Sequence, residues 1–475
     1  MKKYMKSFFS FSVGTWIRAF ISFIATPITS YLLAPEEMGK FAMFSLALGI
    51  LNVFVFLGTD QAFVRFFNEY EKEKRNKLLW ECLYPTLANG VVISVIVLLL
   101  GDRVSTTLYG RFYPYINLLL IATIFIAIFQ LFNQYTILME GNGMLYSLIN
   151  VVNAIANMVS TIIFALILNG SFYALVLGTL VGYIAALLTG IWKNTYYWKP
   201  TFVNWKDIKK HLVFGLPLVP TFMVNWIYTS IDKISLRQFS TLEEIGLYSA
   251  AFKLVSVINL IQDGFSKFWI STAYKRYEED KNDVQFFKKA HDMVALVMFL
   301  TGFLALGFKD IIFLILAKRY RPSANIAPFL IFMPILYSIS ETAVVGINFT
   351  KKTHWHLVIS VACAIVNFIG NTVLVPIYGA KGAAFSTGMS YIVYYIMRMR
   401  ISEKLYPIGF DKKRPPLVVL ILTLVAMRGT ISSDILQNVF FSFIGIVLLL
   451  IIYKNEFVTL ISQFKGTIGF LVKKK

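Results

Sequence analysis

Residues 8–44 read FFSFSVGTWIRAFISFIATPITSYLLAPEEMGKFAMF, and this stretch sets the interpretation of the whole chain. The segment from Phe9 to Leu33 is apolar and, at about 1.5 Å per residue, long enough to cross a bilayer. Arg18 lies inside it, where a charged side chain costs about 2.5–3.5 kcal/mol on insertion scales. Because a cation at this depth normally faces protein or water rather than lipid, Arg18 is the first candidate functional residue.

The composition excludes a soluble globular protein. Hydrophobic residues make up 57% of the 475 and charged residues 15%, and the mean hydropathy is +0.67. The net charge of +20 would suggest nucleic acid for a soluble chain, but no basic, aromatic-rich RNA-binding motif is present, so no nucleic-acid partner is expected. No small-residue cleavage site follows the first apolar segment, which is therefore predicted to be a retained helix. Cys82 and Cys363 form no paired motif and are predicted to be packing residues.

Apolar stretches of spanning length recur along the chain and predict an all-α polytopic membrane protein. We expect about 14 transmembrane helices, with 12 plus a re-entrant hairpin as the alternative. The predicted spans cover residues 8–33, 41–64, 83–100, 116–138, 149–168, 172–192, 212–234, 245–270, 294–308, 326–347, 357–375, 380–399, 416–427 and 439–453.

Lysine and arginine are distributed unevenly between alternate loops. With the N-terminus in the cytoplasm, the cytoplasmic segments hold 30 of these residues, Arg398 among them, and the outer loops hold 10, including Lys40 and Lys309. Positively charged loops stay in the cytoplasm, so both termini are predicted to be cytoplasmic. Five further cations lie within spans or at their ends: Arg18, Arg65, Lys233, Lys253 and Lys267.

Three sequence matches at nearly one offset indicate an internal repeat. Their shifts are 207, 208 and 210 residues, and they pair Glu36–Gly39 with Glu243–Gly246, Arg111–Asn117 with Arg319–Asn325, and Asn153–Asn157 with Cys363–Asn367. We therefore predict a six-helix lobe over residues 1–200, a second over residues 205–405, and an additional helix pair over residues 415–455. Because six spans return the chain to its starting side, the lobes should be related by an axis along the membrane normal, with the substrate between them.

The repeated Glu-Glu-apolar-Gly stretch is interpreted as a helix-start signal. Pro35 suits a first helical position, and Thr241 with Glu244 forms a capping box. Acidic residues in a first turn also suit the helix dipole. Helix breakers inside spans, Pro27, Pro217 and Pro220, predict kinks that serve either gating or packing.

Charges inside the predicted spans are the candidate site residues. The cations are Arg18, Arg65, Lys253 and Lys267, and the acids are Asp60, Asp232, Asp263 and Glu341. Snorkelling toward the interface is an alternative explanation for Arg65 and Lys267. Asp263 and Lys267, four residues apart, also have the spacing to neutralise each other.

Several chemistries have no sequence support. The chain lacks the Gly-x-x-x-x-Gly-Lys-Ser/Thr motif of an ATP motor, and its histidines, taken to lie in or beside cytoplasmic loops, show no metal-binding spacing. No outer loop is long enough for a sugar-transferring active site. We expect neither an enzyme nor a cofactor or metal.

The residues resemble the polysaccharide-unit flippases, the Wzx-like members of the MOP exporter superfamily, over essentially the whole chain. The similarity is carried by Gly14, Thr15, Arg18, Pro27, Leu33–Gly39, Leu57–Phe67, Phe214–Pro217, Ser230–Lys233, Phe265–Trp269 and Tyr274. It implies two lobes around a central cavity with a cationic lining. It also implies a polyprenyl-pyrophosphate-linked oligosaccharide that moves from the cytoplasmic to the outer leaflet of a bacterial cell membrane.

The charges inside the spans fit that mechanism. A lipid-linked glycan keeps its tail in the bilayer, so the protein need only offer its head group a wet, positive path, which Arg18, Arg65, Lys253 and Lys267 can supply. Because ATP is excluded, alternating access must use ion or membrane-potential energy, with Asp60, Asp232, Asp263 or Glu341 carrying H⁺ or Na⁺. Membrane lipid, a polysaccharide polymerase and glycosyltransferases are the other expected partners.

Three other functions predict different features of the chain. A lipid II flippase would share the same architecture. A drug or cation antiporter of the superfamily would have an acid-dominated cavity, whereas the first two spans of each half carry five basic and three acidic residues. A membrane glycosyltransferase or polymerase would need a large outer loop.

Overall fold

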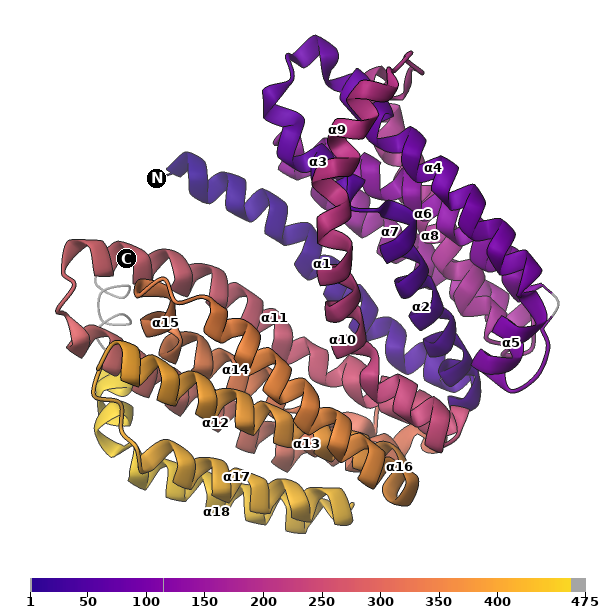
Figure 1. The fold of residues 1–475 in the computed structure, drawn as a ribbon. Coiled ribbons are helices and arrows are strands. Elements are labelled where there is room, and N and C mark those ends of the chain that lie inside the picture. Colours follow the sequence, from indigo (N-terminus) through magenta and orange to yellow (C-terminus); the bar gives the residue numbers. More distant parts are fainter. Residues whose placement is uncertain (1, 114, 463–475) are drawn as a thin grey trace, which may run out of the picture. The chain divides into compact units, whose positions relative to one another are not determined.

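A computed structural model describes residues 2–113 and 115–462 (Figure 1). Side chains up to residue 12, and at positions 254, 260, 261, 263, 267 and 271, lie outside this description. Within the described residues the chain is helical and contains no β-strand. The predicted all-α class is therefore confirmed.

Among the described residues, eleven helices are long and apolar enough to cross a membrane, or twelve if the bent pair Lys318–Asn325 and Ala327–Ala343 is one span. This count omits α1 (Lys2–Leu32), which is 31 residues long, and takes α16 (His354–Leu405) as a single helix. The chain is thus a multi-pass membrane protein.

Helix α16 is an antiparallel pair of spans joined at Gly379. Gly379 has φ of 54° and ψ of −131°, a conformation that interrupts the helix and that glycine adopts without steric cost. The arms before and after it pack together: a Cβ on Gly382 would lie 2.4 Å from the carbonyl oxygen of Leu374, and Asn367 donates a hydrogen bond to Thr387 at 3.2 Å. The two arms correspond to the predicted spans at residues 357–375 and 380–399.

Contacts divide the chain into two compact units. The first comprises residues 1–237 and 241–246, and the second comprises residues 238–240 and 247–475. The first includes α9 and most of α10 because α9 packs on α3 and α4, and Trp226 of α10 lies against Gly49 of α2. The predicted lobe boundary near residue 205 stays a prediction.

The first unit is built around α7, which packs against α1, α6 and α8, and α6 also packs against α8. Helix α7 begins where the side chain of Asn142 accepts a hydrogen bond from the N–H of Leu145. The helices of this unit after α1 are α2 (Pro35–Phe56), α3 (Thr59–Phe66), α4 (Arg75–Leu99), α5 (Gly101–Tyr109), α6 (Ile116–Met139), α7 (Gly143–Ile167), α8 (Tyr173–Lys193), α9 (Trp205–Gly215) and α10 (Val219–Phe239).

In the second unit, α12 packs against α14, α17 and α18, and α14 also packs against α16. The C-terminal pair α17 and α18 lies side by side, and Figure 1 draws it in yellow next to α12. The helices of this unit are α11 (Leu242–Glu279), α12 (Val284–Phe313), α13 (Ala327–Leu330), α14 (Phe332–Ala343), α15 (Val345–Phe349), α16, α17 (Arg414–Ile431) and α18 (Ile435–Ile452).

The second predicted span, residues 41–64, is wrong as one continuous helix. Helix α2 ends at Phe56, and α3 starts at Thr59, because Leu57 and Gly58 take positive φ values of 50° and 72°. Gly58 sits directly on Gly215 at the end of α9: a Cβ on Gly58 would lie 2.4 Å from the carbonyl oxygen of Gly215. This close approach requires glycine, which explains the break.

The predicted helix starts are confirmed. Pro35 is the first residue of α2, and the Thr241 hydroxyl accepts a hydrogen bond from the N–H of Glu244 at 3.2 Å. Cys82 and Cys363 are both buried and free, as packing residues should be. Pro27 lies inside α1, while Pro217 lies in a 3₁₀ turn between α9 and α10.

Candidate functional site

Arg18 lies on α1 with an exposed side chain. Its Nη1 donates a hydrogen bond to Oδ1 of Asn150 on α7 at 3.3 Å. Asn150 is oriented by its own amide nitrogen, which donates to the carbonyl of Tyr146 at 2.8 Å. The two helices come close because Gly14 has no side chain: its N–H donates to the hydroxyl of Ser147 at 3.0 Å, and a Cβ there would lie 2.3 Å from the Ser147 Cα. A neutral amide thus holds the guanidinium in place.

Lys253 lies in the middle of α11 and is half-buried. No ion pair joins Lys253 or Arg18 to a carboxylate among the side chains that the structure describes. Neither side chain is therefore paired with a described carboxylate, which is the condition that an anion-binding role requires.

Arg65 already has a carboxylate partner. It lies in the last turn of α3 and forms an ion pair with Glu69 at 2.7 Å, and both side chains are exposed. Its guanidinium also lies over the ring of Phe66, 5.6 Å from the centroid. Arg65 is thus a weaker candidate than Arg18. The side chains of the predicted pair Asp263 and Lys267 lie outside the described residues.

Asp60 and Asp232 stay candidates for the acid that carries the coupling ion. Asp60 is buried in the first turn of α3, and its Oδ2 accepts a hydrogen bond from Nε2 of Gln61 at 2.7 Å. Nε2 of Gln61 also donates to the hydroxyl of Tyr135 at 3.4 Å. No cation forms an ion pair with Asp60 within the described part of the chain. Asp232 is half-buried on α10 beside Lys233.

Glu341 forms a buried ion pair that the sequence did not reveal. Its Oε1 lies 2.5 Å from Nη1 of Arg398 on α16, and both side chains are only 8% exposed. The guanidinium also lies over the ring of Tyr394, 4.4 Å from the centroid. Arg398, counted with a cytoplasmic segment in the sequence analysis, is buried within α16 rather than in a loop. Its position inside the predicted span at residues 380–399 agrees with this burial.

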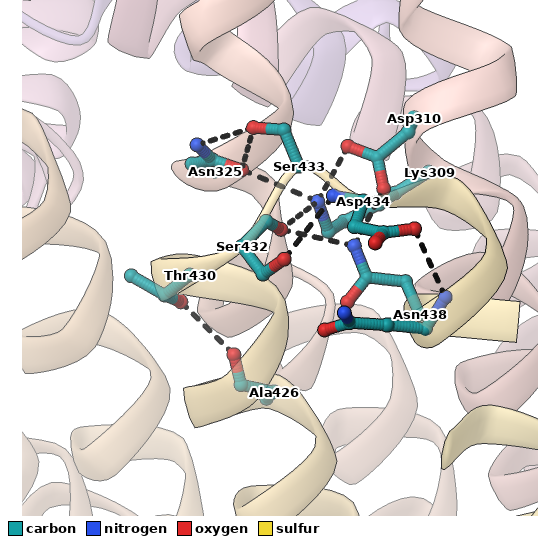
Figure 2. Close-up of polar contacts among 10 residues, drawn as sticks. Lys309, Asp310, Asn325, Ala426, Thr430, Ser432, Ser433, Asp434 and Asn438 are labelled. Carbon is teal, nitrogen blue, oxygen red and sulfur yellow. Dashed lines mark hydrogen bonds and ion pairs between the residues drawn. The ribbon is translucent and has the colours of Figure 1, made fainter. Parts of the chain in front are cut away.

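Lys309 forms a second buried cluster, where α12 meets the turn between α17 and α18 (Figure 2). Its ammonium donates to Oδ1 of Asp310 at 2.7 Å, to Oδ1 of Asn325 at 3.3 Å and to the carbonyl of Ser432 at 3.3 Å. Asn438 donates to the other Asp310 oxygen at 2.7 Å and to Ser432 at 2.9 Å. These bonds satisfy both charges and fix the C-terminal helix pair to α12.

The placement of Lys309 in an outer loop is therefore wrong, as is that of Lys40. Lys40 is 3% exposed and pairs with Glu36 at 2.8 Å and with Glu37 at 2.5 Å within α2.

Two histidines are fully buried: His211 on α9 and His291 near the start of α12. Nε2 of His211 lies 2.9 Å from Oε2 of Glu81, which also accepts a hydrogen bond from the hydroxyl of Tyr70 at 2.8 Å. Burial, and then the Glu81 carboxylate, raise the pKa of Tyr70 above its ordinary value. The described residues contain no His, Cys, Asp and Glu cluster that could hold a metal.

Comparison with known families matches residues 4–265, more than half of the chain, to the family described as polysaccharide biosynthesis protein. The chain belongs to this family. No curated protein sequence matches it.

The fold of this polysaccharide biosynthesis family member is that of known membrane transporters. The lipid II flippase MurJ, in an inward closed conformation, matches with a TM-score of 0.68 and 14% identity over 94% of this chain and 99% of MurJ. An inward-facing multidrug MATE transporter of the MOP superfamily matches with a TM-score of 0.59 and 17% identity over 81% and 94%. A variant of the Vibrio cholerae MATE transporter VcmN matches with a TM-score of 0.56 and 15% identity over 85% and 98%. Family and fold together confirm the resemblance to Wzx-like members of the MOP superfamily.

Proposed function

We propose that the protein moves a polyprenyl-pyrophosphate-linked oligosaccharide from the cytoplasmic to the outer leaflet of a bacterial inner membrane by alternating access. Family membership supports a transporter that serves polysaccharide biosynthesis. The observation that carries the substrate class is Arg18, an exposed guanidinium on the predicted first span whose described contact is a neutral amide. A guanidinium in this setting needs an anion or water, and a pyrophosphate supplies the anion.

The proposed path separates the two parts of the substrate. The polyprenyl tail stays in lipid at no cost, and only the pyrophosphate and sugars need a polar route. Arg18 would bind two phosphate oxygens through its planar fork, and Lys253 would act as a point charge. Asn150 would keep the Arg18 guanidinium oriented, and the other N–H groups of the guanidinium would bind the substrate.

Energy for transport would come from an ion gradient or the membrane potential, because the sequence has no ATP-binding loop. Asp60 is the leading carrier of H⁺ or Na⁺, since it is buried and forms no ion pair with the described cations. Glu341 is less suited because Arg398 already neutralises it. Asp232 and Asp263 stay as alternatives, and a polymerase and glycosyltransferases are the proposed partners.

The test is translocation of a lipid-linked oligosaccharide in reconstituted vesicles. Arg18→Ala should reduce transport at least tenfold, and Arg18→Lys should restore part of it, because the charge returns without the fork. Arg103→Ala is the matched control: Arg103 is exposed on α5 and outside the long spans, and its removal should leave the rate within about twofold. Wild-type transport by an Arg18→Ala, Lys253→Ala double variant would overturn the proposal.

Lipid II is the second candidate substrate, favoured by the likeness of this fold to that of MurJ. The same vesicles loaded with lipid II distinguish the two. Faster transport of lipid II than of a peptide-free lipid-linked glycan would assign the protein to the second function.

A further inference from the structure

Two cavities flank the end of α16. One, of about 590 Å³, lies between this end and the start of α17 and is lined in part by Lys412, Phe410 and Pro416. The other, of about 510 Å³, lies on the side of the loop before α16 and is lined in part by Lys352 and Trp355. Volumes of this size are typical of ligand pockets.

Arg400 and Lys404 line both cavities. They lie four residues apart, on one face of the helix, so their charges are neighbours. With Lys352 and Lys412 they bring four exposed cations to this end of the second unit. Such a concentration of like charge attracts anions.

The two acids near these cations, Glu403 and Asp411, already accept hydrogen bonds from other groups of the protein. Glu403 lines the first cavity, but its carboxylate accepts hydrogen bonds from the N–H groups of Ile408 at 3.1 Å and Gly409 at 2.9 Å, closing the turn after α16. Asp411 accepts from the N–H of Lys413 at 2.8 Å and from Nε of Arg414 at 2.7 Å. Burial opposes ionisation of Asp411, but these hydrogen bonds outweigh it and hold its pKa below the ordinary value.

These acids therefore do not pair with the cations that line the cavities. Among the described residues, no carboxylate forms an ion pair with Arg400, Lys404, Lys412 or Lys352. The nearby Arg414, in contrast, pairs with Asp411, Asp292 and Glu456. A cluster this basic is stabilised when an anion enters it.

The walls of the cavities continue into apolar helix surface. On α17, Leu417 and Leu420 are 48% and 55% exposed, and on α16, Leu357 is 66% exposed. Large apolar side chains exposed on membrane spans contact acyl chains. Trp355 lines the second cavity, and aromatic residues of this type are enriched at membrane interfaces. The positive-inside rule assigns this end of the helices to the cytoplasmic leaflet, which is rich in anionic lipid.

We propose that these cavities bind the phosphate head group of an anionic membrane phospholipid, with Arg400 and Lys404 as the shared cations and the exposed α16 and α17 surfaces as acyl-chain contacts. The lipid is a resident ligand of the transporter and is distinct from the transported substrate. Arg400 would bind phosphate oxygens through its fork, and Lys404, Lys412 and Lys352 would add point charges.

Native mass spectrometry of the delipidated full chain in detergent tests this proposal. The chain is titrated with phosphatidylglycerol, with phosphatidylcholine of the same acyl chains, and with inorganic phosphate. The wild type should bind the first phosphatidylglycerol at least tenfold more tightly than phosphatidylcholine. An Arg400→Gln, Lys404→Gln double variant should lose about 20-fold in phosphatidylglycerol affinity.

A matched control removes two cations elsewhere. Lys206 and Lys209 are exposed on α9 and line neither cavity, so Lys206→Gln, Lys209→Gln should keep wild-type phosphatidylglycerol affinity within about twofold. Lys412→Gln, in the loop before α17, gives a second reading should the double variant not fold, with an expected loss of about fivefold.

Three results would overturn the proposal. The first is equal affinity for the anionic and zwitterionic lipids. The second is wild-type phosphatidylglycerol affinity in a folded Arg400→Gln, Lys404→Gln double variant. The third is inorganic phosphate binding as tightly as the lipid, which would make this a site for a soluble anion.

Discussion

Gly39 and Gly246 bring two helix starts into direct backbone contact. A Cβ on Gly39 would lie 1.8 Å from the carbonyl oxygen of Leu242, and a Cβ on Gly246 would lie 1.8 Å from that of Pro35. These glycines end the two copies of the Glu-Glu-apolar-Gly stretch, so the repeat meets itself at the crossing of α2 and α11. The acidic residues help to start each helix, and the glycine permits the crossing.

Replacing Gly246 with alanine should therefore destabilise the protein by about 1–3 kcal/mol, because the new methyl group overlaps backbone that cannot rotate away. Chemical unfolding in detergent measures the change. Gly264→Ala is the control in the same helix, where nothing lies within 4 Å of the added Cβ, and it should be neutral or slightly stabilising. Equal effects of the two substitutions would contradict the crossing.

Glu341→Gln should lower the free energy of unfolding by about 3–5 kcal/mol, because it leaves the Arg398 charge buried without a partner. The double variant Glu341→Leu, Arg398→Met should lose less than the single one, since both charges are gone. Glu36→Gln is the control: Glu36 is 55% exposed, and its loss should cost below about 1 kcal/mol. Unchanged stability of Glu341→Gln would show that Arg398 has another counter-charge.

Lys309→Met should loosen the C-terminal helix pair, because Asp310 would lose its cation and Ser432 a donor (Figure 2). Hydrogen exchange at residues 425–440 should increase, while exchange in the rest of α12 changes little. Lys318→Met, at an exposed position near the same turn, should leave the exchange pattern as in the wild type. An unchanged pattern in Lys309→Met would place the anchoring of the pair elsewhere.

Asp60→Asn should impair the coupling of transport to an ion gradient more than the binding of substrate. The substitution keeps the size and the hydrogen bond to Gln61 but removes the charge that holds an ion. Transport at zero gradient should fall by less than about threefold, and stimulation by the gradient should disappear. Full gradient-driven transport by Asp60→Asn would transfer the role to Asp232 or Asp263.

Reporter fusions test the orientation. Fusions after Lys199, Lys281 and Lys413 should report the cytoplasm, because they follow the loops in which Lys and Arg accumulate. Fusions after Glu37, Arg111 and Arg237 should report the outer side. Reversed signals at two or more of these six sites would contradict the predicted orientation of the protein in the membrane.

Long apolar runs predicted the spanning helices because a bilayer imposes length and composition directly on the sequence. Pro35 and Thr241 identified helix starts because the residues that start a helix act on backbone groups within the first turn. The break at Leu57 and Gly58 was missed because its cause, the close approach of Gly215, lies far away along the chain.

The sequence by itself determined the membrane class, the spans, the repeated helix starts and the presence of charges within the hydrophobic segments. Only the tertiary structure decided which of those charges have partners. Folding brings Glu341 to Arg398 from another helix, and it brings Asn325 and Ser432 to Lys309, whose carboxylate partner Asp310 is its neighbour in sequence. Arg18 instead meets an amide of α7. The physical reason is that the cost of a charge in a membrane depends on its neighbours in space, and spacing along a helix reports only those within the next turn.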